Sequence, residues 1–178
     1  MGSSTLTFGV GGAWTLGGKP FLYTGGPVLN GTYEFRFSKY FALEAGIHNT
    51  LINVTQFNSI YTLPSVINAG SGFTQAITSS LVMQGSARNT TIPFGLRVIL
   101  PLMKGKVEVF ASGDASHTWN MSQGYQGWGS EAHLGGRMAL DNKHHFWLGT
   151  TGEYMHEMGR IPQNWMTWSA DLSYRFGK

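Results

Sequence analysis

Apolar and polar side chains alternate along almost the whole chain, and this two-residue period constrains the fold more than any other feature. Between Thr5 and Leu16, the even positions are mostly large and apolar, whereas the odd positions are threonine, glycine or alanine. This is the pattern of a β-strand with one apolar and one polar face. We predict eight such strands, at about 5–16, 28–38, 41–50, 90–100, 106–118, 130–140, 146–155 and 165–176.

The connections between these segments alternate in length. Short turns join the second strand to the third, the fourth to the fifth and the sixth to the seventh, whereas long loops lie at about 17–27, 51–89, 119–129 and 156–164. Long and short connections then lie at opposite ends of an up-and-down barrel, as in outer-membrane barrels. Each strand also has the roughly 9–11 residues that a tilted membrane strand needs. We therefore predict an all-β fold in which residues 1–178 form a single domain, an eight-stranded antiparallel up-and-down transmembrane β-barrel.

The distribution of charge favours a polar interior over the apolar interior of a lipocalin-like soluble barrel. Charged residues make up only 12% of the chain, about half the usual share, and no strand centre carries a lysine. Acidic residues and arginines share the polar faces of the strands. The predicted charge network of the lumen consists of Glu34, Arg36, Glu44, Arg97, Glu108, Asp114, Glu131, Arg137, Glu153, Asp171 and Arg175. Because eight strands leave an interior just wide enough for side chains, we predict a plugged lumen.

Aromatic residues gather near the strand ends on the apolar faces. The predicted set is Trp14, Phe37, Phe41, Phe146, Tyr154, Trp168, Tyr174 and Phe176. Aromatic side chains at both ends of an apolar band are typical of the two interfacial girdles of a membrane barrel.

The strand pattern, the loop asymmetry and the ending Leu172-Ser173-Tyr174-Arg175-Phe176 resemble the small OmpA/OmpX-like outer-membrane barrels. Phe176 corresponds to the terminal aromatic residue that the insertion machinery of that family reads, although Gly177 and Lys178 follow it. The resemblance implies the outer membrane of a Gram-negative bacterium, with outer-membrane lipid and lipopolysaccharide as partners. The chain begins with no basic start and no apolar signal core, so we expect that a signal peptide has been removed.

The long segment 51–89 carries Arg88 as its only charge and mixes amide and hydroxyl side chains with apolar ones. Such a surface suits contact with a protein or glycan partner. The alternative is a loop folded over the mouth of its own barrel. Partial alternation at 73–83 also indicates that the flanking strands extend as a hairpin beyond the membrane. We expect a non-enzymatic protein of the cell surface, acting in surface interaction, adhesion or envelope structure.

Two alternatives stay open, a lipid A-modifying enzyme (hydrolase or acyltransferase) and a narrow channel. Tyr154-Met155-His156 is similar in outline to the lipid A deacylase family, but Met158 stands where that family has its nucleophilic serine. His156 and His117 are therefore weak catalytic candidates, and an interfacial position is the favoured explanation for both. Inward-facing residues also form an imaginable catalytic set, which filling of a polar lumen explains as well. This set consists of His48, Asp114, Ser116 and His133.

We expect no cofactor, no metal and no nucleic-acid partner. The chain has no cysteine, and the adjacent His144 and His145 have no evident third ligand. The net charge is only +3, without a run of basic residues. The sequence does not decide between a monomer and a surface assembly.

Overall fold

A computed structural model describes residues 2–16, 23–58, 81–120, 125–158 and 163–177 of the chain. It contains β1 (Ser3–Thr15), β2 (Tyr23–Thr24), β3 (Pro27–Arg36), β4 (Phe41–Asn58), β5 (Leu81–Leu102), β6 (Val107–Asn120), β7 (Tyr125–Ala139), β8 (Phe146–Met158) and β9 (Gln163–Phe176). A short 3-10 turn, η1 (Met103–Gly105), connects β5 to β6. Among the described residues, no helix has the length and apolar character needed to span a bilayer.

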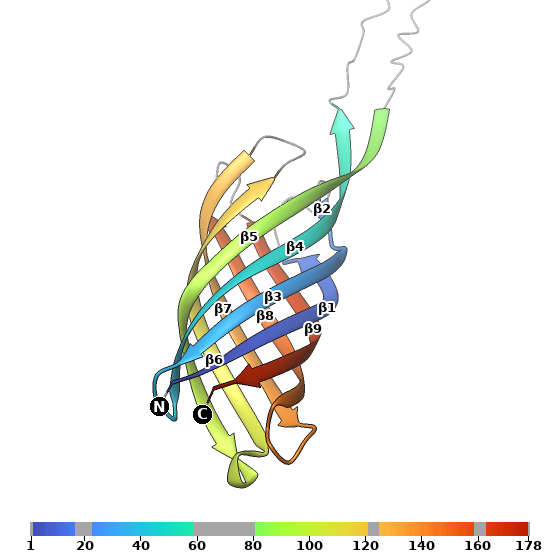
Figure 1. The fold of residues 1–178 in the computed structure, drawn as a ribbon. Helices are drawn as coiled ribbons and strands as arrows, with labels where there is room; N and C mark the ends of the chain where they lie inside the picture. Colours follow the sequence, from blue (N-terminus) through green and yellow to red (C-terminus); the bar gives the residue numbers. More distant parts are fainter. Residues whose placement is uncertain (1, 17–22, 59–80, 121–124, 159–162, 178) are drawn as a thin grey trace, which may run out of the picture.

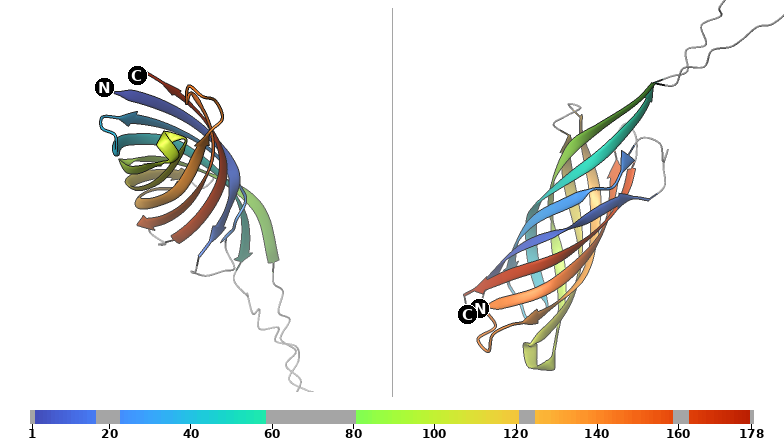
Figure 2. Two further views of the ribbon diagram at one scale, coloured as in Figure 1. Left: turned by 90° about the horizontal axis from the view of Figure 1, so that it is seen from below. Right: turned by 90° about the vertical axis from the view of Figure 1, so that its right-hand side faces the viewer.

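Eight strands form a closed antiparallel barrel (Figure 1). Each strand pairs with its neighbours in the chain, and β1 pairs with β9 to close the ring. The two-residue strand β2 pairs only with the outer part of β4 and adds no member to the ring. Both chain ends lie at the same end of the barrel, because Ser4 pairs with Phe176 (Figure 2). The predicted eight-stranded up-and-down barrel is confirmed.

Strands β4 and β5 extend beyond the predicted ranges 41–50 and 90–100, which confirms the predicted extension of the flanking strands as a hairpin. They pair continuously from His48 and Thr91 to Asn58 and Leu81, so they form a hairpin that projects beyond the rest of the barrel (Figure 1). The predicted loop 51–89 is therefore strand at both ends, and its central part, 59–80, lies outside the described residues. The paired backbones satisfy each other's hydrogen bonds, so these extensions do not require a buried face. Strands also occupy 119–120, 125–129, 156–158 and 163–164 of the other predicted loops.

The ladder between β4 and β5 is interrupted in the barrel wall. Regular pairing ends at Ala45 and Phe94 and resumes at His48 and Thr91. Pro93, which lies opposite Gly46 in this register, has no N–H to donate across the ladder. A Cβ atom at Gly46 would lie 3.2 Å from Cγ of Pro93, so glycine leaves room for the buried proline ring.

The barrel surface is inverted relative to that of a soluble protein. Large apolar side chains on all eight barrel strands are exposed, including Val10 at 59%. Charged and hydroxyl side chains are buried inside, including Glu34 and Glu108, which are almost fully enclosed. The predicted assignment of the apolar face to the exterior is therefore confirmed.

The turn from β7 to β8 is ordered by a single carboxylate. Asp141 accepts hydrogen bonds from the backbone N–H groups of Lys143 (3.2 Å), His145 (2.8 Å) and Phe146 (2.9 Å). Desolvation in the turn raises the pKa of Asp141, but these three donors together outweigh it and lower the pKa below its ordinary value. The ionised side chain thus stabilises the start of β8.

Candidate functional site

The eleven charged residues predicted for the lumen all lie on the inner face of the barrel. Nine of them are buried, and Arg36 and Arg175 are partly buried. Strand alternation explains this placement, since each occupies an inward position of its strand. Ten of them, all but Asp171, form two groups together with two buried histidines. The arginine cluster, near the short turns, is Glu34, Arg36, Arg97, Glu108, Arg137 and Arg175; the histidine cluster, further along the lumen, is Glu44, His48, Asp114, Glu131, His133 and Glu153.

Glu108 of β6 is a centre of the arginine cluster. Its carboxylate accepts hydrogen bonds from Arg36 on β3 (2.9 Å to each oxygen), from Nε of Arg137 on β7 (2.8 Å) and from Arg175 on β9 (2.7 Å). Charge-assisted hydrogen bonds of this kind are the strong ones in proteins. One carboxylate therefore ties together four strands across the lumen.

Glu34 of β3 is the second centre. It accepts hydrogen bonds from Arg97 (3.1 Å) and from Arg137 (2.8 and 3.1 Å). Arg137 thus bridges the two carboxylates, and Arg97 also pairs with Glu44 of the histidine cluster. The guanidinium of Arg97 therefore joins the two clusters.

Aromatic rings complete the packing of the arginine cluster. The guanidinium carbon of Arg97 lies 4.2 Å from the ring centre of Phe110, and that of Arg175 lies 4.3 Å from the ring centre of Trp147. Both distances are those of cation–π contacts. Trp147 is 0% exposed, so this lumen also has an apolar component.

These inward aromatic residues were not predicted from the sequence. Trp147 lies in the apolar run Phe146-Trp147-Leu148, and Phe110 lies between Val109 and Ala111, so the contrast between the two faces is weak at both positions. Their distance from neighbouring charged residues would have identified them. Phe110 lies two positions after Glu108, so both side chains point to the same face of the strand. The inward apolar set also includes Val28, Ala42, Ile99, Met155 and Trp165.

The histidine cluster places two imidazoles among four carboxylates. Nδ1 of His48 lies 3.3 Å from Glu153 and 3.7 Å from Glu131. Nε2 of His133 lies 3.2 Å from Glu131, and its ring centre is 5.8 Å from that of His48. These contacts connect β4, β7 and β8 across the lumen.

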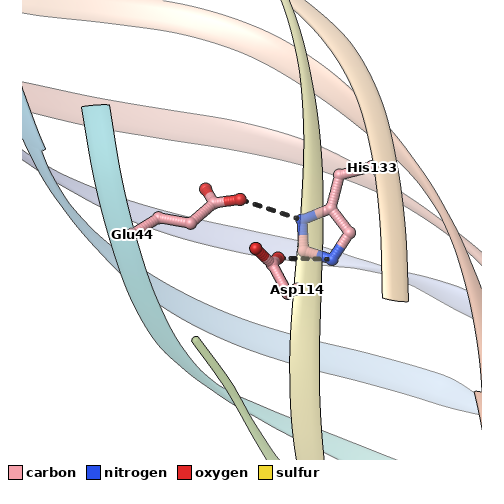
Figure 3. A group of neighbouring side chains, drawn as sticks. All are labelled: Glu44, Asp114 and His133. Atoms are coloured by element: carbon pink, nitrogen blue, oxygen red, sulfur yellow. Dashed lines mark ion pairs between the residues drawn. The ribbon is translucent and has the colours of Figure 1, made fainter. Parts of the chain in front are cut away.

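His133 also contacts two carboxylates from other strands. Its Nδ1 atom lies 3.7 Å from Glu44 of β4, and its Nε2 atom lies 3.5 Å from Asp114 of β6. Figure 3 shows both carboxylates directed toward the imidazole ring. The donor set of these three residues is one that could hold a metal ion.

Among the described residues, small cavities lie in the lumen, and two of them have defined linings. One offers about 20 Å³ to the centre of a water-sized sphere and is lined in part by His48, Arg97 and His133. The other offers about 10 Å³ and is lined in part by Trp165 and Thr167. Spaces of this size hold individual water molecules.

The eight predicted girdle aromatics all lie on the exterior and are exposed. His117 lies outward against the rings of Trp119 (4.3 Å between centres) and Trp128 (4.7 Å). Nδ1 of His156, another outward residue, lies 2.7 Å from Oδ1 of Asn164. These contacts suit interfacial side chains, and the catalytic roles of both histidines stay predictions.

Comparison with known proteins supports the fold. No protein-family description and no curated protein matches the chain. Among solved structures, OprG from Pseudomonas aeruginosa matches with a TM-score of 0.67 and 10% identity, over 99% of this chain and 97% of that one. Ail of Yersinia pestis, the attachment invasion locus protein, solved with the heparin analogue sucrose octasulfate, matches with a TM-score of 0.57 and 12% identity, over 98% and 99%. The chain thus has the fold of the small eight-stranded outer-membrane β-barrels, which confirms the predicted resemblance.

Proposed function

We propose that this protein is an integral outer-membrane β-barrel with a packed lumen that acts at the cell surface through its β4–β5 hairpin and long loops. The inverted surface is the observation that carries the proposal. A continuous exterior of exposed apolar side chains requires an apolar solvent, and the buried charges inside exclude the lumen as the apolar core of a soluble barrel. The aromatic girdles are the side chains that contact outer-membrane lipid and lipopolysaccharide.

The packed lumen is supported by the pairing of its charges. Each arginine of the arginine cluster is within ion-pair distance of Glu34 or Glu108, and the cavities described above have room only for water. An ion crossing this region would have to displace several charge-assisted hydrogen bonds.

A planar-bilayer measurement tests the packed lumen. We expect purified, refolded protein to show no conductance above the leak of a protein-free bilayer, because the arginine cluster fills the cross-section. The Arg137→Ala variant, which removes the guanidinium that bridges both carboxylates, serves as the comparison. Discrete channels in the wild-type protein would contradict the packed lumen and favour the narrow-channel alternative.

The surface role is supported by the β4–β5 hairpin. Eight paired residues of β4 beyond Thr50 extend roughly 27 Å at about 3.4 Å per residue. The hairpin therefore carries the uncharged stretches 51–58 and 81–87 beyond the barrel wall, where a protein or glycan partner can reach them. Ail, which shares the fold, is described as an attachment protein and was solved with a sulfated heparin analogue. Adhesion to a surface glycan or protein is the function that we favour.

A shortened hairpin tests this role. Asn58 and Leu81 are directly paired, so an Asn-Gly turn can replace residues 59–80 and close the hairpin. We expect cells that display the shortened protein to lose the several-fold gain in adherence to heparin-coated and epithelial surfaces that the wild type confers. The control is the same replacement at 121–124, between β6 and β7, which should retain adherence. Equal adherence of wild-type and shortened proteins, with equal amounts in the outer membrane, would contradict the proposed role.

A further inference from the structure

We propose that Glu44, Asp114 and His133 form a binding site for a divalent transition-metal cation inside the barrel. The three residues come from β4, β6 and β7, and their side chains converge in the lumen (Figure 3). Two carboxylate oxygens and one imidazole nitrogen are ligands that Zn²⁺ and its neighbours in the first transition row accept. This site goes beyond the surface role proposed above and departs from the expectation of no metal.

The spacing of the three side chains fits such a cation. One ligand atom from each residue lies within 4.8 Å of the other two. Zinc bonds of roughly 2.0–2.2 Å place tetrahedral ligands about 3.4 Å apart, so each side chain must move by less than about 1 Å. The cavity that His133 lines has room for water, and water molecules are the remaining ligands that we expect.

The hydrogen bonding of the two carboxylates points to a ligand. Asp114 is only 5% exposed, yet neither of its carboxylate oxygens has a hydrogen-bond partner among the described residues. Its charged neighbours are His133, at 3.5 Å, and the carboxylates of Glu44 and Glu131. Glu44, which is 2% exposed, lies 3.7 Å from His133 and forms an ion pair with Arg97, which it shares with Glu34. Burying carboxylates without hydrogen bonds is costly, and a bound cation removes that cost.

The second group of potential ligands shows the contrast. In the set His48, Glu131 and Glu153, the Glu153 carboxylate accepts a hydrogen bond from Thr167 at 2.9 Å and contacts His48 at 3.3 Å. Its oxygens therefore already have partners within the protein. For this reason we assign the metal to Glu44, Asp114 and His133, and Glu153 provides a matched control.

Zinc titration of the refolded, chelator-treated full chain, without an affinity tag, tests the site. We expect saturable binding of one Zn²⁺ per chain by calorimetry. Asp114→Asn and His133→Gln should weaken binding by more than the roughly 10–100-fold that loss of an outer-shell partner causes. Glu153→Gln should bind as the wild type does. All proteins carry His144→Ala and His145→Ala, which remove the adjacent histidines of the exposed turn.

A proton shared between Glu44 and Asp114 is the competing way to relieve their repulsion. In that case the wild-type chain shows no saturable zinc binding, and the proposal is overturned. Equal binding by Asp114→Asn and the wild type overturns it as well. If Asp114→Asn and His133→Gln do not refold, Cu²⁺ bound to the chain that carries only His144→Ala and His145→Ala decides: electron paramagnetic resonance should show coupling to one imidazole, and coupling to two or none contradicts the assignment.

Discussion

Replacing Glu108 with glutamine is expected to lower the free energy of unfolding by roughly 3–5 kcal/mol. The carboxylate accepts hydrogen bonds from Arg36, Arg137 and Arg175 at 2.7–2.9 Å and is 2% exposed. Glutamine keeps the volume but leaves three guanidinium groups facing one neutral amide, so buried positive charge loses its compensation. Urea unfolding in lipid vesicles, followed by tryptophan fluorescence, measures the change.

Two further variants make this result specific to the network. Lys104→Gln removes a charge from the exposed turn η1 and should change the unfolding free energy by less than about 0.5 kcal/mol. Arg175→Gln, alone and combined with Glu108→Gln, completes a double-mutant cycle. We expect the double variant to be less destabilised than the sum of the single variants, because each single change leaves an unpaired charge. A loss below about 1 kcal/mol for Glu108→Gln, or strict additivity, would show that the ion pairs do not stabilise the barrel.

The second large effect is expected on the outer surface. Val10 is 59% exposed and lies midway along β1 between Leu6, which pairs with Tyr174 of one girdle, and Trp14 of the other. Arginine at a lipid-facing position near the bilayer midplane costs about 2–4 kcal/mol. We expect Val10→Arg to lose that amount in the same urea unfolding measurement, because its guanidinium would lie in hydrocarbon.

An exposed position at a different depth in the membrane serves as the control. Leu140 is also exposed but lies where β7 meets the short turn to β8, so Leu140→Arg should cost only about 0–1 kcal/mol. Both variants add the same side chain to an exposed site. Equal effects at the two positions would contradict the placement of Val10 at the midplane of the membrane.

The alternation of side chains was sufficient to predict the barrel, its inverted surface and the inward direction of the charged residues. This succeeds because a strand in a barrel wall has only two faces, so alternate side chains point to the lumen and to the exterior. It was less informative at apolar runs, where both faces carry similar residues, and Trp147 and Phe110 were missed there. Beyond Thr50, β4 and β5 continued past the predicted ranges 41–50 and 90–100, and partial alternation at 73–83 had indicated that they extend as a hairpin.

The sequence alone could not predict which charged side chains meet across the lumen. Arg36 and Glu108 are 72 positions apart, and their contact depends on the stagger of all strands between them. The pairing of Glu44 and Asp114 with His133 has the same origin. The alternation of side chains predicted that these residues point into the lumen. Their positions along the barrel axis depend on the strand register, which only the structure gives.

The interrupted ladder at Pro93 and Gly46 lies within the closed wall, because β4 stays paired with β3 and β5 stays paired with β6 on either side of it. The wall extends to Thr50, and the hairpin begins beyond that residue. We therefore expect the backbone amides of 55–58 to exchange with solvent faster than those of 41–50, which pair with β3 as well as with β5. Local opening of the hairpin would then leave the ring of barrel strands closed.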